Sequence, residues 1–296
     1  MPARIGGRRR ASATRGKAKS KGSVKSRRAK RRESLSTTLS KGRSELLRGL
    51  RHRTFATVKP GVLTVAVYAN FYPIAYKQRG RFQGLDVLLM RRFAKAAGLR
   101  LELVEANHFD GIWLQVANGA ADVSIGGIGM TPGRMHPNLA WSIPYFRVQR
   151  TVVYNRHDPL RHFPQDVRRT VLGTVGSTGW IDAQTRASRV GKDKFMKPGT
   201  TDPEDVRHLM HGDVQGLMRG SFVGRAIVDR SKGKLAMAHP WEILPELVTS
   251  DGEVFAFPTH KDSGLAAGIS AWLTFLRDSG QLTPLLTKYH LLSHHR

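Results

Sequence analysis

The chain has 296 residues, a hydrophobic content of 40% and a formal net charge of +27, with 49 Lys and Arg against 22 Asp and Glu. That length allows two modest domains with apolar cores. The absence of cysteine excludes disulfides, thiolate metal sites and cysteine catalysis. No run of about 18 apolar residues occurs, so we expect no transmembrane helix.

The excess positive charge is concentrated at the N-terminus. Residues 1–59 carry 20 Lys and Arg against Glu33 and Glu45, whereas the rest of the chain carries 29 against 20. Such a segment buries too little apolar surface to offset its ordering entropy, so we expect residues 1–59 to be a disordered basic tail. Within it, Ser44–Arg53 is the segment able to form a short helix. The tail is typical of arms that contact nucleic acid or an anionic surface, and also of solvated tails without a partner.

Beyond Pro60, short apolar runs alternate with amphipathic segments of helical length. The predicted strands are Leu63–Tyr68, Leu101–Glu105, Val123–Ile125, Thr151–Tyr154, Val171–Val175, Gly216–Met218 and Val254–Phe257. The predicted helices are Asp86–Ala97, Gly111–Asn118, Gly179–Arg189, Asp202–His211, Ser221–Asp229 and Ser263–Ser279. This alternation indicates an α/β fold with mostly parallel sheets. One doubly wound sheet would give the same pattern, so the number of lobes is left open by the pattern alone.

The segment from Gly119 to Tyr145, GAADVSIGGIGMTPGRMHPNLAWSIPY, carries the chemistry of a binding site. A short strand runs into a glycine-rich turn, where backbone N–H groups can approach a ligand closely. An arginine just beyond offers a planar fork of donors matched to a carboxylate. A strand end, free N–H groups and one guanidinium form a site for a small anion and do not form a nucleophile. The residues expected to contact that anion are Gly127, Gly129, Thr131 and Arg134.

The same segment resembles the signature of the family 3 extracellular solute-binding proteins, in which T-x-x-R is followed by an aromatic-Ser-x-Pro-Tyr run. Other segments match in the family's order: GVLTVAVYANFYPIAY (61–76), GLDVLLMRRFAKAAGL (84–99), FDGIW (109–113) and GTVGSTGW (173–180). The resemblance extends from about Pro60 to Leu292. It implies a two-lobed periplasmic-binding-protein-like type II fold, with mostly parallel sheets flanked by helices and a ligand cleft at the hinge. Lobe one would be 60–154 plus 252–292, and lobe two 155–251.

The resemblance also assigns roles to single residues. In that family the signature arginine holds the α-carboxylate of an amino acid, a role that falls on Arg134. The loop after the first strand implies that Phe71, Tyr72 and Tyr76 cover the ligand, with core packing as the alternative. Asn70 would bond the ligand or cap the turn.

Ser177 and Thr178 open a helix in the second lobe, where the family's Gly-Ser-Thr turn contacts the ligand carboxylate. Simple helix capping is the alternative for both residues.

Two positions depart from the family. Gly129 stands where a Ser or Thr often contacts the ligand's amino group. Arg219 stands in the segment where amino-acid binders carry an aspartate for the α-ammonium group, which an arginine would repel. With Arg134 and Arg219 present and no evident carboxylate, the sequence favours a ligand with two acidic groups or one without an amine. The alternative is that Arg219 faces solvent or pairs with Asp213.

The leading interpretation is a monomeric, non-catalytic receptor for a small carboxylate ligand, amino-acid-like or a dicarboxylate, which serves an ABC-type transporter in the periplasm. Residues 1–59 lack the apolar stretch of roughly 7 to 15 residues that a signal peptide needs, which keeps a cytoplasmic location as an alternative. A nucleic-acid-associated protein that acts through the basic tail is a further alternative. We expect no cofactor and no metal, because no third ligand accompanies His208 and His211.

An enzyme is the other class considered. Ser142–Tyr154 and Ser270–Leu282 resemble cyclohexadienyl dehydratases, which act on prephenate, a dicarboxylate without an amine. A dehydratase needs a general acid to expel water. The matched positions hold Trp180 and Arg219 instead of acids, so the sequence favours binding over catalysis.

Overall fold

The computed structural model describes residues 29, 40–157, 171–187, 196–199, 202–239 and 252–292. The chain divides into two units, Met1–Glu45 and Leu46–Arg296. In the first unit, Ala29 and residues 40–45 are helical. The second unit begins with helical residues 46–52, in which Leu50 is 1% exposed and belongs to the apolar core.

The prediction that the whole segment 1–59 is disordered is therefore wrong for residues 40–59. Leu46, Leu47, Leu50 and Phe55 pack against the core and supply the apolar surface that the more basic residues lack. Residues 1–28 and 30–39 of the predicted tail lie outside the described residues.

The first sheet is built around β1 (Val62–Tyr68), whose seven residues are all buried. Its other strands are β5 (Arg100–Ala106), β6 (Val123–Ile125), β7 (Leu139–Trp141) and β14 (Pro258–His260). The order is β5-β1-β6-β14-β7, in which β1 is parallel to both neighbours and β14 is antiparallel to both of its own. A central strand that is apolar throughout is typical of a sheet covered on both faces.

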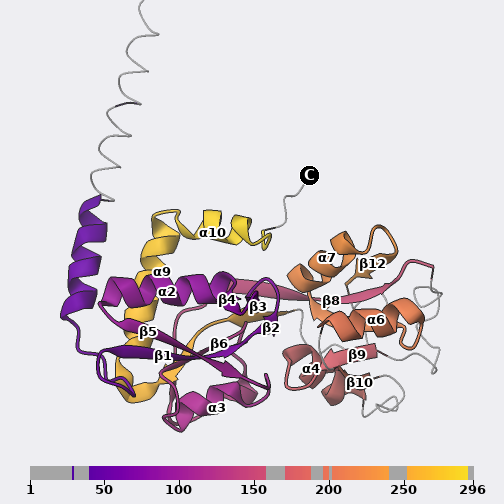
Figure 1. The fold of residues 1–296 in the computed structure, drawn as a ribbon, viewed down its shortest axis with the longest axis horizontal. Coiled ribbons are helices and arrows are strands. Elements are labelled where there is room, and N and C mark those ends of the chain that lie inside the picture. The colour runs from indigo at the N-terminus through magenta and orange to yellow at the C-terminus, as the bar shows by residue number, and fades with distance from the viewer. Residues whose placement is uncertain are drawn as a thin grey trace, which may run out of the picture. The chain divides into compact units, whose positions relative to one another are not determined.

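Helices cover both faces of this sheet (Figure 1). They are α2 (Leu85–Ala97), α3 (Ile112–Ala117), α9 (Leu265–Asp278) and α10 (Leu282–Lys288). Side chains alternate along β1, so Leu63 and Val65 join the core under α2 and α9, while Ala66 and Tyr68 join the cluster under α3. This sheet and its helices form the first lobe.

The second sheet has the order β10-β9-β11-β8-β12. Its strands are β8 (Phe146–Asn155), β9 (Val171–Thr174), β10 (Met196–Gly199), β11 (Gly216–Gly220) and β12 (Leu235–Ala238). Strands β10, β9 and β11 are parallel, and β8 is antiparallel to β11 and β12. The helices of this second lobe are α4 (Thr178–Ala187), α6 (Asp202–His211) and α7 (Ser221–Arg230).

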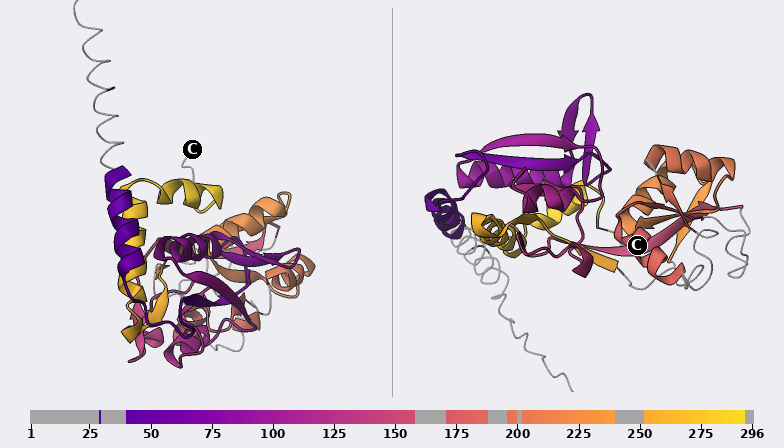
Figure 2. Two further views of the ribbon diagram at one scale, coloured as in Figure 1. Left: turned by 60° about the vertical axis from the view of Figure 1, so that its left-hand side comes forward. Right: turned by 90° about the horizontal axis from the view of Figure 1, so that it is seen from below.

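Two adjacent antiparallel strands join the lobes. The first half of β8 pairs with β13 (Gly252–Phe255), and its second half, from Arg150 onward, pairs with β11. Figures 1 and 2 show β8 passing from one lobe into the other. The α/β prediction with two lobes is thus confirmed, and the predicted limits of the lobes, 60–154 plus 252–292 and 155–251, stay a prediction.

The sequence missed several short elements. A hairpin-like sheet of β2 (Asn70–Phe71), β3 (Ala75–Gln78) and β4 (Arg81–Gln83) follows β1, and β7, β10, β12 and α10 were not predicted. The predicted strand Val254–Phe257 covers the end of β13 and the two residues before β14, because the chain changes sheets there. None of the described helices combines the length and the apolar character that a membrane crossing requires.

Candidate functional site

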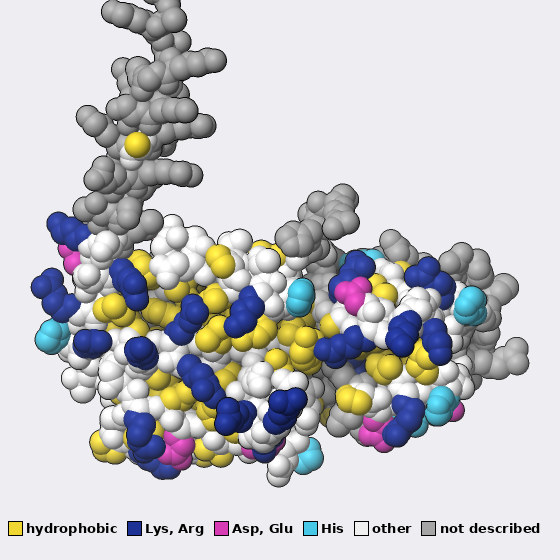
Figure 3. Space-filling view, turned by 45° about the horizontal axis from the view of Figure 1, so that its top comes forward, with side chains coloured by type: hydrophobic (Ala, Val, Ile, Leu, Met, Phe, Trp, Pro, Cys, Tyr) yellow, Lys and Arg dark blue, Asp and Glu magenta, His cyan; other side chains and the backbone are white. Residues whose placement is uncertain are grey.

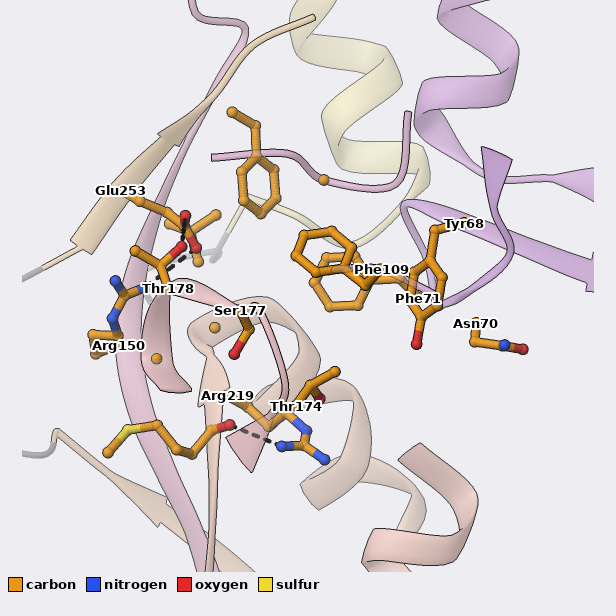
Figure 4. Close-up of a pocket in the computed structure, with 16 residues that line it drawn as sticks. Tyr68, Asn70, Phe71, Phe109, Arg150, Thr174, Ser177, Thr178, Arg219 and Glu253 are labelled. Carbon is orange, nitrogen blue, oxygen red and sulfur yellow. Dashed lines mark hydrogen bonds and ion pairs between the residues drawn. The ribbon is translucent and has the colours of Figure 1, made fainter. Parts of the chain in front are cut away.

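A cavity of about 60 Å³ lies between the lobes, beside the crossing strands. Figure 4 shows the rings of Phe71 and Phe109 on one side of it, and Arg150, Thr178 and Glu253 on the other. The remaining lining residues are Tyr68, Asn70, Gly127, Val148, Thr174, Ser177, Gly179, Met218, Arg219, Gly220 and Phe255. The cavity therefore combines an aromatic wall with a wall of polar and charged groups.

A buried carboxylate shapes the glycine-rich turn of the first lobe. Asp86, at the start of α2, accepts hydrogen bonds from the N–H groups of Gly126 (3.1 Å) and Gly127 (2.9 Å) and from the Tyr145 hydroxyl (2.5 Å). Burial raises the pKa of Asp86 to about 6, although these hydrogen bonds oppose the increase. Gly127 has φ +70°, and a Cβ there would lie 2.5 Å from Cε1 of Phe71, so the turn requires glycine.

Arg134 lies in the short helix η1 (Pro132–Arg134) and is 1% exposed. Its Nη1 donates to the Gly129 carbonyl (2.9 Å) and its Nη2 to the Gly176 carbonyl (2.6 Å). The guanidinium also stacks on Phe109 and Trp113, at 5.2 and 4.9 Å from the ring centres. Desolvation lowers the pKa of Arg134, and the nearby Glu253 opposes that change. Because Gly129 and Gly176 belong to different lobes, Arg134 bridges them.

Glu253 is the functional candidate that the sequence analysis missed. Its side chain is 11% exposed, and Oε1 lies 3.2 Å from Nη1 of Arg150. Oε2 accepts from the Thr178 hydroxyl and lies 3.9 Å from Nη1 of Arg134. The prediction of a cleft without a carboxylate is therefore wrong, because β13 returns from the second lobe and carries Glu253 into the cavity.

The missing side chain of Gly129 makes room for this carboxylate. A Cβ at Gly129 would lie 1.8 Å from Oε2 of Glu253. The departure from the family pattern at position 129 thus removes a hydroxyl and admits a charged group in its place.

Arg219 is compensated inside the second lobe. It is 6% exposed at the end of β11, and Nη2 donates to the buried carboxylate of Asp205 on α6. Its Nη1 donates to the Met218 carbonyl at 2.9 Å. The two alternatives predicted for Arg219, exposure to solvent and an ion pair with Asp213, are both wrong. The Arg219 side chain is buried, and Asp213 instead bonds Nδ1 of His208 (2.8 Å).

The structure brings together six of the predicted contacts. The cavity lining includes Asn70, Phe71, Gly127, Ser177, Thr178 and Arg219. The Ser177 hydroxyl accepts from the Trp180 N–H (3.1 Å), which is a helix-capping bond.

The other five predicted residues are not among the lining residues. Gly129 and Arg134 lie next to the Glu253 carboxylate. The Thr131 hydroxyl is buried and has no hydrogen-bond partner among the described residues. Tyr72 and Tyr76 line a second cavity. No cluster of His, Asp and Glu side chains that could hold a metal occurs in the part of the chain that the structure describes.

Comparison with known proteins places this geometry in context. The family model described as bacterial extracellular solute-binding proteins, family 3, matches residues 63–292. "Probable amino-acid-binding protein YxeM" of Bacillus subtilis is 26% identical over 235 residues, which cover 77% of this chain and 83% of that protein. "Membrane-bound lytic murein transglycosylase F" of Idiomarina loihiensis is 22% identical over 209 residues, 70% of this chain. The chain spans only 44% of the length of that transglycosylase.

Solved structures show the same fold. A mutant of ArgBP from T. maritima is 25% identical, with a TM-score of 0.66 over 77% of this chain and 95% of that one. The ancestral amino acid-binding protein AncCDT-1, a precursor of cyclohexadienyl dehydratase, is 20% identical, with a TM-score of 0.64 over 78% of this chain and 96% of that one. At that identity, the second likeness concerns the fold alone.

Proposed function

The chain belongs to family 3 of the bacterial extracellular solute-binding proteins, and we propose that it binds an amino acid in the cavity beside the crossing strands. The observation that carries this proposal is Glu253, a nearly buried carboxylate in contact with the guanidinium groups of Arg150 and Arg134. The carboxylate of a zwitterion can replace Glu253 at a guanidinium. The released Glu253 can then accept the ammonium group of the same ligand.

The contacts between the lobes support a receptor that closes on its ligand. Nη2 of Arg134 donates to the Gly176 carbonyl of the second lobe, and the rings of Phe71 and Phe222 meet edge to face with their centres 5.6 Å apart. The cavity of about 60 Å³ is small for an organic solute, so the lobes must separate to admit one. A ligand that engages Glu253, Thr178 and the arginines together stabilises the closed form over the open one.

We further propose that the ligand is an amino acid with a neutral side chain. Asp205 already neutralises the charge of Arg219, so the second-lobe wall of the cavity does not need an acidic side chain on the ligand for charge balance. A second carboxylate on the ligand would approach Glu253 and be repelled. This proposal replaces the expectation, drawn from the sequence, that dicarboxylates or keto acids bind best.

We propose that a membrane component of an ABC-type transporter recognises the closed form. In this proposal the chain acts as a monomer outside the cytoplasm, as the family description indicates for its members. Binding needs no cofactor in this scheme, because charge pairing and lobe closure supply the recognition.

A comparison of ligands and variants tests the proposal. Calorimetric titrations would use neutral amino acids, their 2-keto acids and dicarboxylates on the wild type and on Glu253→Gln. We expect a neutral amino acid to bind the wild type best, and Glu253→Gln to weaken that binding about 10- to 100-fold, on the scale of a lost charged hydrogen bond. Keto-acid binding should change only a few-fold. Glu204→Gln, on the half-exposed outer side of α6, is the matched control.

Two results would contradict the proposal. One is a wild type that binds a dicarboxylate most tightly. The other is a Glu253→Gln variant with unchanged affinity for every amino acid that the wild type binds.

Glu253 also supports a second candidate, a dehydratase that acts on prephenate. The sequence argued against catalysis because no acid was found, and Glu253 is a carboxyl group inside the cavity. In the structure, however, Glu253 accepts from Thr178 and Arg150, whereas a general acid must donate a proton. Incubation with prephenate decides between the two. Turnover by the wild type that is lost in Glu253→Gln would establish the enzyme, and no turnover is expected.

A further inference from the structure

A second and larger cavity, of about 660 Å³, lies between the lobes on the far side of Phe71. The β2–β3 hairpin forms one wall, and α6, α7 and the segment leading into β12 form the other. Asn70 lines both cavities. Val223, whose side chain is buried, lines the second cavity, whereas Phe71, which contacts Phe222 edge to face, lines the first.

The body of this cavity is apolar. Half-buried side chains of Val206, Met210 and Ile227 line the second-lobe wall. Tyr72 and Tyr76 line the first-lobe wall, with ring centres 4.9 Å apart. A volume of this size falls within the range of roughly 300–1,000 Å³ that is usual for small-molecule sites, which are mostly apolar with a few polar groups.

Within the part of the chain that the structure describes, the charged side chains that line this cavity are all cationic. Arg230 stacks over the Tyr72 ring at 4.1 Å, and Lys232 and Lys234 follow in the loop before β12. Lys77 forms an ion pair with Glu105, at 2.5 Å. Figure 3 shows the same bias on the face drawn there, where Lys and Arg are spread over both lobes and Asp and Glu are few.

We propose that this cavity is a second binding site, for an amphipathic organic anion. An aromatic or branched apolar body would lie against the tyrosines and the α6–α7 wall. A single carboxylate, sulfonate or phosphate group would face Arg230, Lys232 and Lys234. The guanidinium of Arg230, held 4.1 Å above the centre of the Tyr72 ring, supplies a planar set of N–H donors for such a group. Among the described residues, Asn70 alone lines both this cavity and the amino-acid site, and these cationic side chains belong to this cavity.

An arylsulfonate whose fluorescence increases in apolar sites, 1-anilinonaphthalene-8-sulfonate, serves as the probe on the full chain. We expect saturable binding to the wild type with one site per chain. The triple variant Arg230→Gln/Lys232→Gln/Lys234→Gln should weaken that binding at least about tenfold. Ala226→Trp, which fills the cavity from α7, should abolish it. Lys95→Gln, on the exposed side of α2, is the matched charge control and should leave it unchanged.

Further controls separate this site from other sources of probe binding. The uncharged analogue N-phenyl-1-naphthylamine should bind the wild type and the triple variant alike, because it lacks the group that the cations recognise. Glu253→Gln should not alter probe binding, which separates this site from the amino-acid site. The proposal is overturned if the folded Ala226→Trp variant, checked by circular dichroism, still binds the probe as the wild type does. It is equally overturned if the triple variant does.

Discussion

Arg219 and Asp205 form a buried pair whose two partners both belong to the second lobe, whereas Arg134, Arg150 and Glu253 draw on the first lobe and both crossing strands. Because both partners of the first pair belong to one lobe, a movement of the lobes relative to each other does not separate them. The second group is complete only when Thr178 and Gly176 of the second lobe come into contact with it. We therefore expect the Arg219–Asp205 pair to contribute to stability, and the group of Arg134, Arg150 and Glu253 to contribute to ligand recognition.

The strongest test of this contrast removes the carboxylate of the first pair. Asp205→Ala removes the buried carboxylate that accepts from Arg219, and breaking a buried ion pair typically costs about 3–5 kcal/mol of unfolding free energy. Urea denaturation of the unliganded protein measures this loss. Asp213→Ala is the control, because its pair with His208 is more than 40% exposed on both sides and should contribute less than about 1 kcal/mol. A loss for Asp205→Ala no larger than the control's would assign no structural role to the pair.

Asp86, a buried carboxylate that is held by hydrogen bonds, offers a second test of buried charge. The pKa of Asp86 rises from 3.8 to about 6 in the folded protein because of burial. Between these values the folded state retains a proton that the unfolded state has lost, so the unfolding free energy falls as the pH rises from about 4 to about 6. A shift of that size corresponds to about 3 kcal/mol.

Asp86→Asn should remove this contribution, because an amide keeps an acceptor for Gly126 and Gly127 and does not titrate. Urea denaturation at several pH values from 4 to 7 should give a flatter profile for Asp86→Asn than for the wild type. Asp278→Asn, at an exposed site, should leave the wild-type profile intact. Parallel profiles for the wild type and Asp86→Asn would show that Asp86 ionises equally in both states.

The smallest expected effect is on ligand affinity and concerns Arg134, which belongs to the group formed with Arg150 and Glu253. Arg134→Ala should weaken binding of the amino acid by about 2 kcal/mol or more, on the scale of truncating one partner of a buried charge pair. Calorimetry measures this loss. Arg134→Lys keeps the charge but loses the planar fork that reaches Gly129 and Gly176 together, so it should recover only part of the affinity. Full recovery by lysine would mean that charge alone matters at this position.

The sequence predicted best what depends on neighbours along the chain. β1, β6 and α2 follow from apolar runs and periodicity, and Asn70, Phe71, Gly127, Ser177 and Thr178 lie in local motifs that end strands or begin helices. Each of these residues reaches the cavity because its own element points there.

Glu253 could not be found in this way. Its place depends on the return of the chain from the second lobe and on pairing of β13 with β8, which no local pattern contains. Tyr72 and Tyr76 were misplaced for a related reason. Tyr76 lies opposite Asn70 in the β2–β3 pair and both line the second cavity, whereas Phe71, one residue on, lies opposite Ala75 and lines only the first. Alternation along a hairpin separates aromatic residues that the sequence places together.

The space left by Gly129 constrains how this site can evolve. A serine or threonine at position 129 would place its Cβ within 1.8 Å of the present Oε2 of Glu253. A hydroxyl at position 129 would therefore displace the Glu253 carboxylate from its contacts with Thr178 and Arg150, which a shorter side chain at position 253 would avoid. A substitution at position 129 alone crowds the cavity, and a substitution at position 253 alone removes its carboxylate. Homologues should thus show the two positions changing together, as one inherited exchange of a hydroxyl for a carboxylate.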